Sequence, residues 1–169
     1  MEEKYYALGA GRLYIAPWET PETEVRSLKW YAGQTKGGIT LAYTAKEYEI
    51  RGWGGELQRT VRYGEKIRLT GKFARLYPRV IAAATGAPVS DSAILLGGRG
   101  DAGRMSRVRV LLVSEIPESA GGGEVVFSMR AGASSGMSVQ FSPERDSAWD
   151  FSLTAECDDA GVSGKLVLG

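Results

Sequence analysis

The chain has 169 residues, of which 43% are hydrophobic, so it is long and apolar enough for one domain with a proper core and is not intrinsically disordered. Its net charge is only +1, which provides no overall field that favours nucleic acid or membrane binding. One cysteine, Cys157, and no histidine exclude an intramolecular disulfide, a cysteine–histidine zinc site and a histidine-based catalytic triad. No segment approaches the roughly 18 apolar residues of a membrane helix, and the first residues predict no signal peptide.

The first third of the chain contains three candidate strands separated by turns. Residues 13–17 form a short apolar strand that ends at a proline, and a polar loop over 20–24 follows. Residues 28–31 end in an aromatic pair. A long strand is predicted over 39–50, and the glycine-rich segment 51–55 ends it.

Residues 60–73 are predicted to form the clearest strand of the chain. Its odd positions are mostly apolar, and cations take even positions, so an alternating strand carries a core face and a basic row. Gly64 is expected to mark a bulge or bend within it. The basic row consists of Arg62, Lys66, Arg68 and Lys72.

One helix is predicted within residues 75–86. Pro78 suits its first turn, where the missing N–H costs nothing. Gly86 stands where a left-handed C-terminal cap is expected. Val80, Ile81, Ala83 and Ala84 form its apolar side, which is expected to pack on a sheet.

The second half of the chain reads as a series of short strands. In the last clear alternation, Trp149, Phe151, Leu153, Ala155 and Cys157 share one face, so Cys157 is predicted to be buried. The predicted strands are 93–96, 105–113, 124–130, 137–141, 149–157 and 162–168. The whole chain, 1–169, is therefore predicted to be a single mainly β domain: an antiparallel β-sandwich or half-barrel with one flanking α-helix.

The order of these segments resembles that of the major tail tube proteins of long-tailed bacteriophages and prophages. The resemblance covers most of the chain. It rests on LYIAP at 13–17, WYAGQTKGGITLAY at 30–43, EKIRLTGKFARLYPRVIAAATG at 65–86 and WDFSLTAECDDAG at 149–161. It extends to contractile-tail and type VI secretion tubes.

The resemblance implies a structural protein without catalytic residues, cofactor or metal. Six copies would form a ring, and rings would stack into a tube within the virion tail, assembled in the cytoplasm of the bacterial host. The partners implied are further copies of the chain, other tail proteins, and DNA that passes through the lumen without specific binding. Ring size, tail type and the strand that faces the lumen do not follow from the sequence.

Two groups of residues are candidates for subunit contacts. Trp30, Tyr31 and Trp53 lie beside glycine-rich turns and could form interface contacts, stack on sugars or pack in the core. The basic row could contact an acidic surface of a neighbouring subunit, follow phosphates, or be an ordinary solvated strand face. The carboxylates of Asp150 and Glu156 are the candidates for a lumen surface, because a passage for DNA should not bind phosphates tightly.

The charge distribution fits contacts between copies as well as ordinary scatter. Residues 1–90 carry 14 Lys and Arg against 9 Asp and Glu, a net of +5, and residues 91–169 carry 7 against 11, a net of −4.

The loop 97–103 lacks the following helix that a phosphate-binding loop needs. The alternative function is a carbohydrate- or ligand-binding β-sandwich that uses the three aromatic residues.

Overall fold

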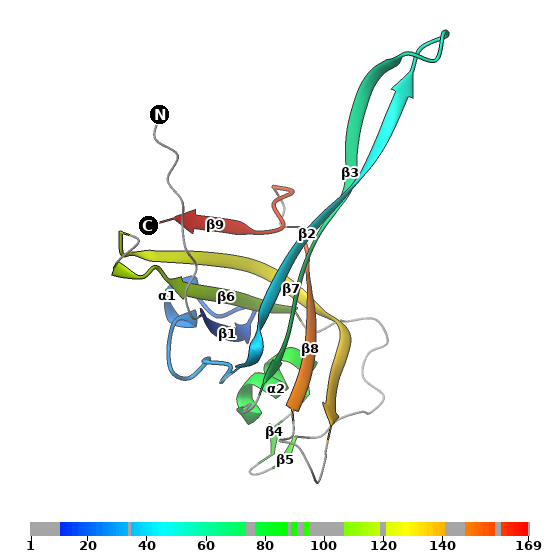
Figure 1. The fold of residues 1–169 in the computed structure, drawn as a ribbon. Coiled ribbons are helices and arrows are strands. Elements are labelled where there is room, and N and C mark those ends of the chain that lie inside the picture. Colours follow the sequence, from blue (N-terminus) through cyan, green and yellow to red (C-terminus); the bar gives the residue numbers. More distant parts are fainter. Residues whose placement is uncertain are drawn as a thin grey trace.

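The computed structural model describes residues 11–33, 35–73, 77–87, 89–90, 93–94, 107–118, 121–140, 148–157 and 160–168. The predicted loop at 97–103 lies outside them. The described chain is mainly β, as predicted, with one antiparallel seven-stranded sheet that does not close into a barrel (Figure 1). The strands are β1 Gly11–Pro17, β2 Thr35–Arg51, β3 Leu57–Phe73, β4 Val89–Ser90, β5 Ala93–Ile94, β6 Arg107–Glu115, β7 Glu124–Gln140, β8 Ala148–Ala155 and β9 Lys165–Leu168.

The main sheet has the strand order β1-β6-β7-β8-β3-β2, and β9 also pairs with β7. The short strands β4 and β5 pair only with each other. Strands β8 and β9 follow one another along the same edge of β7, because β8 pairs with the second half of β7 and β9 with residues 125–128. Hydrogen bonds from Ile15 N to Trp30 O (2.9 Å) and from Ala32 N to Leu13 O (2.8 Å) attach residues 30–32 to β1.

Strand β7 joins two segments that the sequence analysis separates. Residues 124–130 and 137–141, with small residues between them, are predicted as two strands, but β7 runs without interruption from Glu124 to Gln140. Its pairing with β8 shifts register between Ala133 and Met137. The small residues therefore accommodate an irregularity within one strand instead of ending it.

Buried side chains lie on both faces of the sheet. Leu13, Ile15, Val108 and Val110 belong to the larger core cluster, which also contains Val80 of the helix α2 (Pro78–Thr85). We call this side the α2 face. Tyr14, Ala16, Leu111 and Val113 point to the opposite side, where they pack with Val25 of the helix α1 (Glu22–Val25). We call this side the α1 face.

The predicted helix is confirmed as α2. Pro78 occupies its first turn, and Gly86 ends it in the left-handed conformation, with φ of 68°. Val80, Ile81 and Ala84 are buried, and Ala83 packs on the α2-face core. Local signals were sufficient here because a proline start, a glycine stop and an apolar stripe all act within one short segment.

A second helix was not predicted. Residues 20–24 were interpreted as a polar loop, but Glu22–Val25 forms the single turn of α1. Val25 is fully buried against the sheet and anchors this turn. One buried side chain in an otherwise polar segment gives no helical periodicity, so tertiary packing determines this helix.

An exposed ion pair connects the end of α1 to β7. The Arg26 Nη1 donates to Glu124 Oε2 at 2.8 Å, and Arg26 Nη2 donates to Glu124 Oε1. This hydrogen bonding lowers the pKa of Glu124 below its ordinary value, since it favours the ionised carboxylate.

We expect the substitution Arg26→Gln to raise the pKa of Glu124 towards its ordinary value, measured by NMR titration of the Glu124 carboxyl carbon. The interaction stabilises the fold above the unfolded pKa of glutamate and is lost as the pH falls through the lowered pKa of the folded state. Arg59→Gln on an exposed part of β3 is the control and should leave the titration unchanged. An unaltered pKa in Arg26→Gln would contradict the pairing.

Candidate functional site: a projecting arm and a charged sheet face

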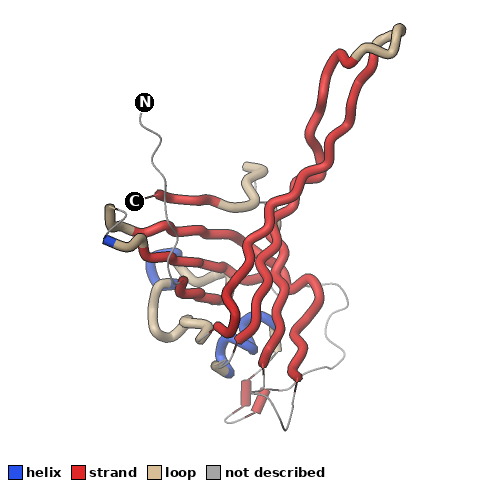
Figure 2. The backbone as a smooth tube through the Cα atoms, viewed as in Figure 1, coloured by secondary structure: helices blue, strands red, loops and turns tan. Residues whose placement is uncertain are grey.

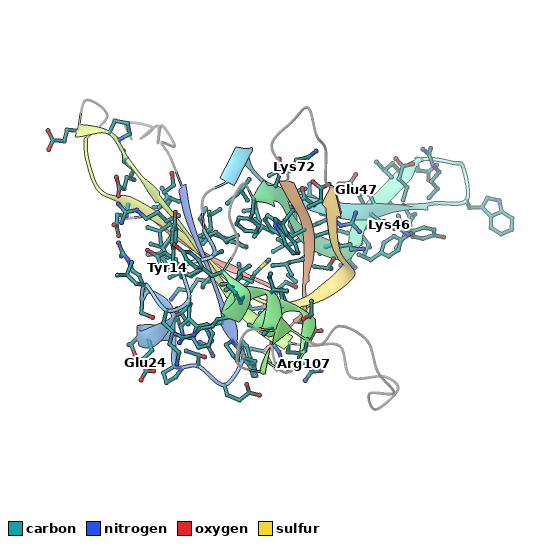
Figure 3. The ribbon with its side chains drawn as sticks, turned by 90° about the horizontal axis from the view of Figure 1, so that it is seen from below. Tyr14, Glu24, Lys46, Glu47, Lys72 and Arg107 are labelled. Atoms are coloured by element: carbon teal, nitrogen blue, oxygen red, sulfur yellow. The ribbon has the colours of Figure 1, made fainter. Side chains whose placement is uncertain are left out.

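The hairpin formed by β2 and β3 extends far beyond the rest of the sheet (Figures 1 and 2). Strand β3 pairs with β8 only through Arg68–Phe73, whereas its pairing with β2 continues to Leu57. Residues 44–66 therefore form a two-stranded ribbon, which we call the arm. Lys46 and Glu47 lie in this arm, near its base (Figure 3).

The arm ends in an ordered turn that exposes an indole ring. Gly52 N donates to Glu56 O at 2.8 Å, and Arg51 Nη1 donates to Gly55 O at 3.0 Å. Gly55 has φ of 82°, a conformation that favours glycine. Trp53 in this turn is fully exposed. A large aromatic side chain at the tip of a defined turn is available for contact with another molecule.

The two faces of the arm differ in chemistry. Directly opposed residues share a face of a sheet, so the pairs Tyr48–Val61 and Lys46–Tyr63 place three apolar side chains on one side. Tyr48 and Tyr63 are more than half exposed, at 62% and 51%. Ile50, also exposed, continues this strip, which we call the apolar strip: Tyr48, Ile50, Val61 and Tyr63. Lys46 and Arg59, the register partners of Tyr63 and Ile50, lie on the same face. The opposite face carries the ion pair between Arg62 Nε and Glu47 Oε1, at 3.0 Å.

A bulge in β3 changes the predicted basic row. Thr44 pairs with Lys66 and Lys46 pairs with Tyr63, so β3 has one more residue than β2 between these pairs. The extra residue lies at Gly64 and Glu65, where Gly64 has φ of 61°. Because one inserted residue reverses the alternation, Arg62 lies on the face opposite to Lys66, Arg68 and Lys72. The prediction of a four-residue row is therefore wrong for Arg62, although the bulge itself was expected.

The structure places one residue of the basic row, Lys72, beside one of the predicted lumen carboxylates, Asp150. Lys72 and Asp150 are register partners on β3 and β8, and Lys72 Nζ lies 3.6 Å from Asp150 Oδ1. Glu156 Oε2 lies 3.0 Å from Arg107 Nε and 3.8 Å from Arg130 Nε. Both carboxylates proposed for a lumen surface are thus paired with cations of the same chain. Lys66 and Arg68 make no ion pair within the described part of the chain.

The three aromatic candidates lie in different parts of the fold. Trp30 and Tyr31 are partly buried and pack against the α1-face core beside β1. The Tyr31 ring contacts those of Tyr14 and Tyr77, with centroids 5.8 and 6.4 Å apart. Trp53 is at the far tip of the arm, so the three residues do not form one aromatic surface. Of the three, Trp53 remains available for an interface.

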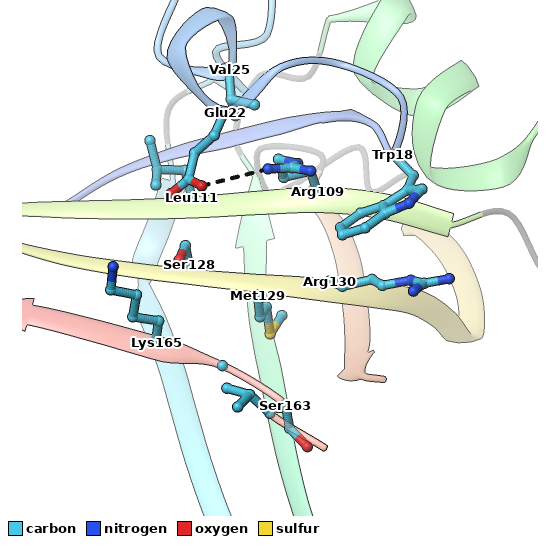
Figure 4. Close-up of a pocket in the computed structure, with 12 residues that line it drawn as sticks. Trp18, Glu22, Val25, Arg109, Leu111, Ser128, Met129, Arg130, Ser163 and Lys165 are labelled. Atoms are coloured by element: carbon cyan, nitrogen blue, oxygen red, sulfur yellow. Dashed lines mark ion pairs between the residues drawn. The ribbon is translucent and has the colours of Figure 1, made fainter. Parts of the chain in front are cut away.

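A pocket opens on the α1 face next to α1, with a volume of about 430 Å³. Arg109 on β6 and Arg130 on β7 are directly opposed across the strands and share this face with Ser128. Each guanidinium carbon lies 4.5 Å from the centroid of the Trp18 ring (Figure 4). Lys165 of β9 approaches the same space from the other side of the pocket (Figure 4).

Neither the apolar strip nor this pocket was predicted from the sequence. A signal for the pocket was present in β6, where apolar residues lie on both faces and indicate that both are covered. A cation among them, such as Arg109, is therefore expected to be partly buried. The strand pairing that brings Arg130 and Trp18 to it joins distant segments and gives no local pattern.

Cys157 was predicted to be buried, and this is wrong. Strand β8 ends at Ala155, so the alternation no longer holds two residues later. Cys157 is exposed, and its Sγ lies 3.1 Å from Ser163 Oγ.

Two further features of the described residues bear on metal binding and on membrane insertion. No three His, Cys, Asp or Glu side chains group together as metal ligands in the described ranges. Among the same residues, no helix is both long and apolar enough to span a bilayer.

No protein-family model matches the chain, and no curated protein matches it.

Proposed function

We propose that the chain is a non-enzymatic structural subunit that assembles with copies of itself, as in the stacked hexameric rings of bacteriophage tail tubes. Its partners would be further copies, other tail proteins and the DNA that passes through the tube. The observation that carries this proposal is the arm with its exposed apolar strip and fully exposed Trp53.

The physical argument starts from the low stability of an isolated ribbon. Two strands alone are marginally stable in water, because each side chain has neighbours on only one partner strand. The arm exposes Tyr48, Ile50, Tyr63 and Trp53 without a covering layer from the described chain. Packing this strip against a second copy would remove its apolar surface from water. The arm is thus suited to reach a neighbour.

Free strand edges support the same proposal. Strand β2 pairs only with β3, and β9 pairs only with β7, among the described strands. Leu166, Val167 and Leu168 of β9 are between 43% and 56% exposed. Exposed edges promote pairing between chains, and a closed ring would use them as joining surfaces. Lys66 at the base of the arm and Arg68 next to it have no ion-pair partner among the described residues and so offer positive charge to an acidic neighbour.

The test compares self-assembly of the parent with that of two double variants. We expect the parent to form rings or tubes at high concentration, seen by negative-stain microscopy and sedimentation velocity. Tyr48→Ser with Tyr63→Ser removes the two aromatic side chains of the apolar strip and should raise the concentration needed for assembly about tenfold or more. The matched control, Glu47→Gln with Arg62→Gln, alters the opposite face of the same ribbon and should assemble like the parent, since exposed ion pairs contribute little.

Two results would contradict the proposal. Unaltered assembly of the tyrosine variant would remove the role of the apolar strip. A parent that remains monomeric at every concentration, also when mixed with a tail initiator complex, would overturn the structural function itself.

A further inference from the structure

The pocket beside α1 contains two arginines, each with one nitrogen that no described residue accepts a hydrogen bond from. Arg109 and Arg130 keep only 24% and 16% of their side-chain exposure. The Nε atom of each is buried and has no hydrogen-bond partner among the described residues. A buried donor without a partner costs free energy, so this arrangement is unfavourable in the chain alone.

The nearest carboxylates do not satisfy these groups. Arg109 Nη1 lies 3.6 Å from Glu22 Oε2, and Arg130 Nε lies 3.8 Å from Glu156 Oε2, both longer than a hydrogen bond. Glu156 is closer to Arg107, at 3.0 Å. Among the described residues that line the pocket, Arg109, Arg130 and Lys165 are cations and Glu22 is the carboxylate, and Arg109 directly opposes Arg130 across the strands. Like charges at this spacing repel each other.

The rest of the pocket determines which anion it suits. Trp18 stacks on both guanidinium groups, and Val25, Leu111 and Val162 provide apolar walls. Such walls disfavour a strongly hydrated inorganic ion, which would lose its water without compensation. They favour an anion attached to an apolar group. A volume of about 430 Å³ falls within the range of small-molecule sites.

We propose that this pocket binds an organic carboxylate, whose charge is held by Arg109 and Arg130 and whose apolar part lies between Trp18 and Val162. The carboxylate accepts hydrogen bonds from the planar guanidinium groups. Its negative charge compensates the positive charge of the arginines that Glu22 and Glu156 leave uncompensated. This inference does not depend on self-assembly, because every residue that lines the pocket belongs to the same chain.

The experiment uses 3-phenylpropionate as the probe, titrated by calorimetry into the dilute full chain. 3-Phenylpropan-1-ol is the neutral analogue, and inorganic phosphate is the anion without an apolar part. We expect saturable binding of the carboxylate and at least about tenfold weaker binding of the other two, since charge-assisted hydrogen bonds and apolar contact are both required. The indole N–H resonance of Trp18 should shift with the carboxylate.

The variants assign the binding to the pocket. Arg109→Gln with Arg130→Gln should weaken binding at least about tenfold, while the control Arg59→Gln on the arm should bind like the parent. Should the double variant fail to fold, Ser128→Leu keeps both arginines and blocks the pocket by size, and it should also abolish binding. Equal affinity for the carboxylate and the alcohol, retained affinity in the pocket variants, or no saturable binding at millimolar concentration would each overturn the proposal.

A second readout identifies where the carboxylate comes from. It can belong to a free small molecule or to an acidic side chain of a second copy. In the second case, 3-phenylpropionate should dissociate the assembled protein in sedimentation velocity. In the first case, it should leave the sedimentation coefficient unchanged. Both results support carboxylate binding and differ only in its source.

Discussion

Replacing Phe73 with alanine should lower the free energy of unfolding by about 3–5 kcal/mol, the range for truncating a buried phenylalanine. Phe73 is 1% exposed and stacks on Phe151, with ring centroids 4.6 Å apart. It belongs to the core cluster that also contains Val80 of α2. Removing the ring therefore leaves a cavity between β3 and β8 within this core, which the surrounding main chain is unable to fill completely.

Urea denaturation of dilute protein measures this effect, read from the transition midpoint at an unchanged slope. The matched control is Tyr63→Ala, which truncates an aromatic residue of the same strand that is 51% exposed on the arm. We expect the control to change stability by no more than about 0.5 kcal/mol. Equal losses in both variants would show that the core is not centred on Phe73.

Replacing Gly71 with alanine should destabilise the protein by about 1–3 kcal/mol through overpacking. A Cβ atom at this position would lie 2.8 Å from Phe151 Cε1, 3.0 Å from Phe151 Cζ and 3.3 Å from Gly38 O. The Phe151 ring is itself held against Phe73 and is buried, so it has little room to move. The added methyl group must therefore displace a core ring or main chain.

Gly11→Ala is the control for this substitution. Gly11 lies in the edge strand β1, and its Cβ would meet Leu112 Cδ1 of β6 at 3.3 Å, the end of a flexible side chain. The added methyl group should therefore be tolerated within about 0.5 kcal/mol. In the double variant Gly71→Ala with Phe151→Leu, the loss should be smaller than the sum of the two single losses, because the smaller side chain relieves the contact. Full additivity, or a stable Gly71→Ala variant, would contradict the packing described here.

The short-range features of the fold could be predicted because each depends on neighbouring residues only. Pro78 and Gly86 mark the start and stop of α2, and the alternation through Phe151 and Leu153 identifies the buried face of β8. Gly64 indicated the bulge in β3. Such signals act within one element, so chemistry and spacing along the chain are sufficient to read them.

Pairing between distant strands decided the features on which the two proposals depend. The register of β2 with β3 places Arg62 and Lys66 on opposite faces of the ribbon. The shorter pairing of β3 with β8 leaves the arm without a third strand. The pairing of β3 with β8 also places Lys72 beside Asp150, and that of β6 with β7 opposes Arg109 and Arg130. A periodic pattern indicates that a strand has two different faces. It does not specify which element packs on each face, or at which residue the neighbouring strand stops. That choice depends on contacts between residues far apart in the chain, which only the folded arrangement determines.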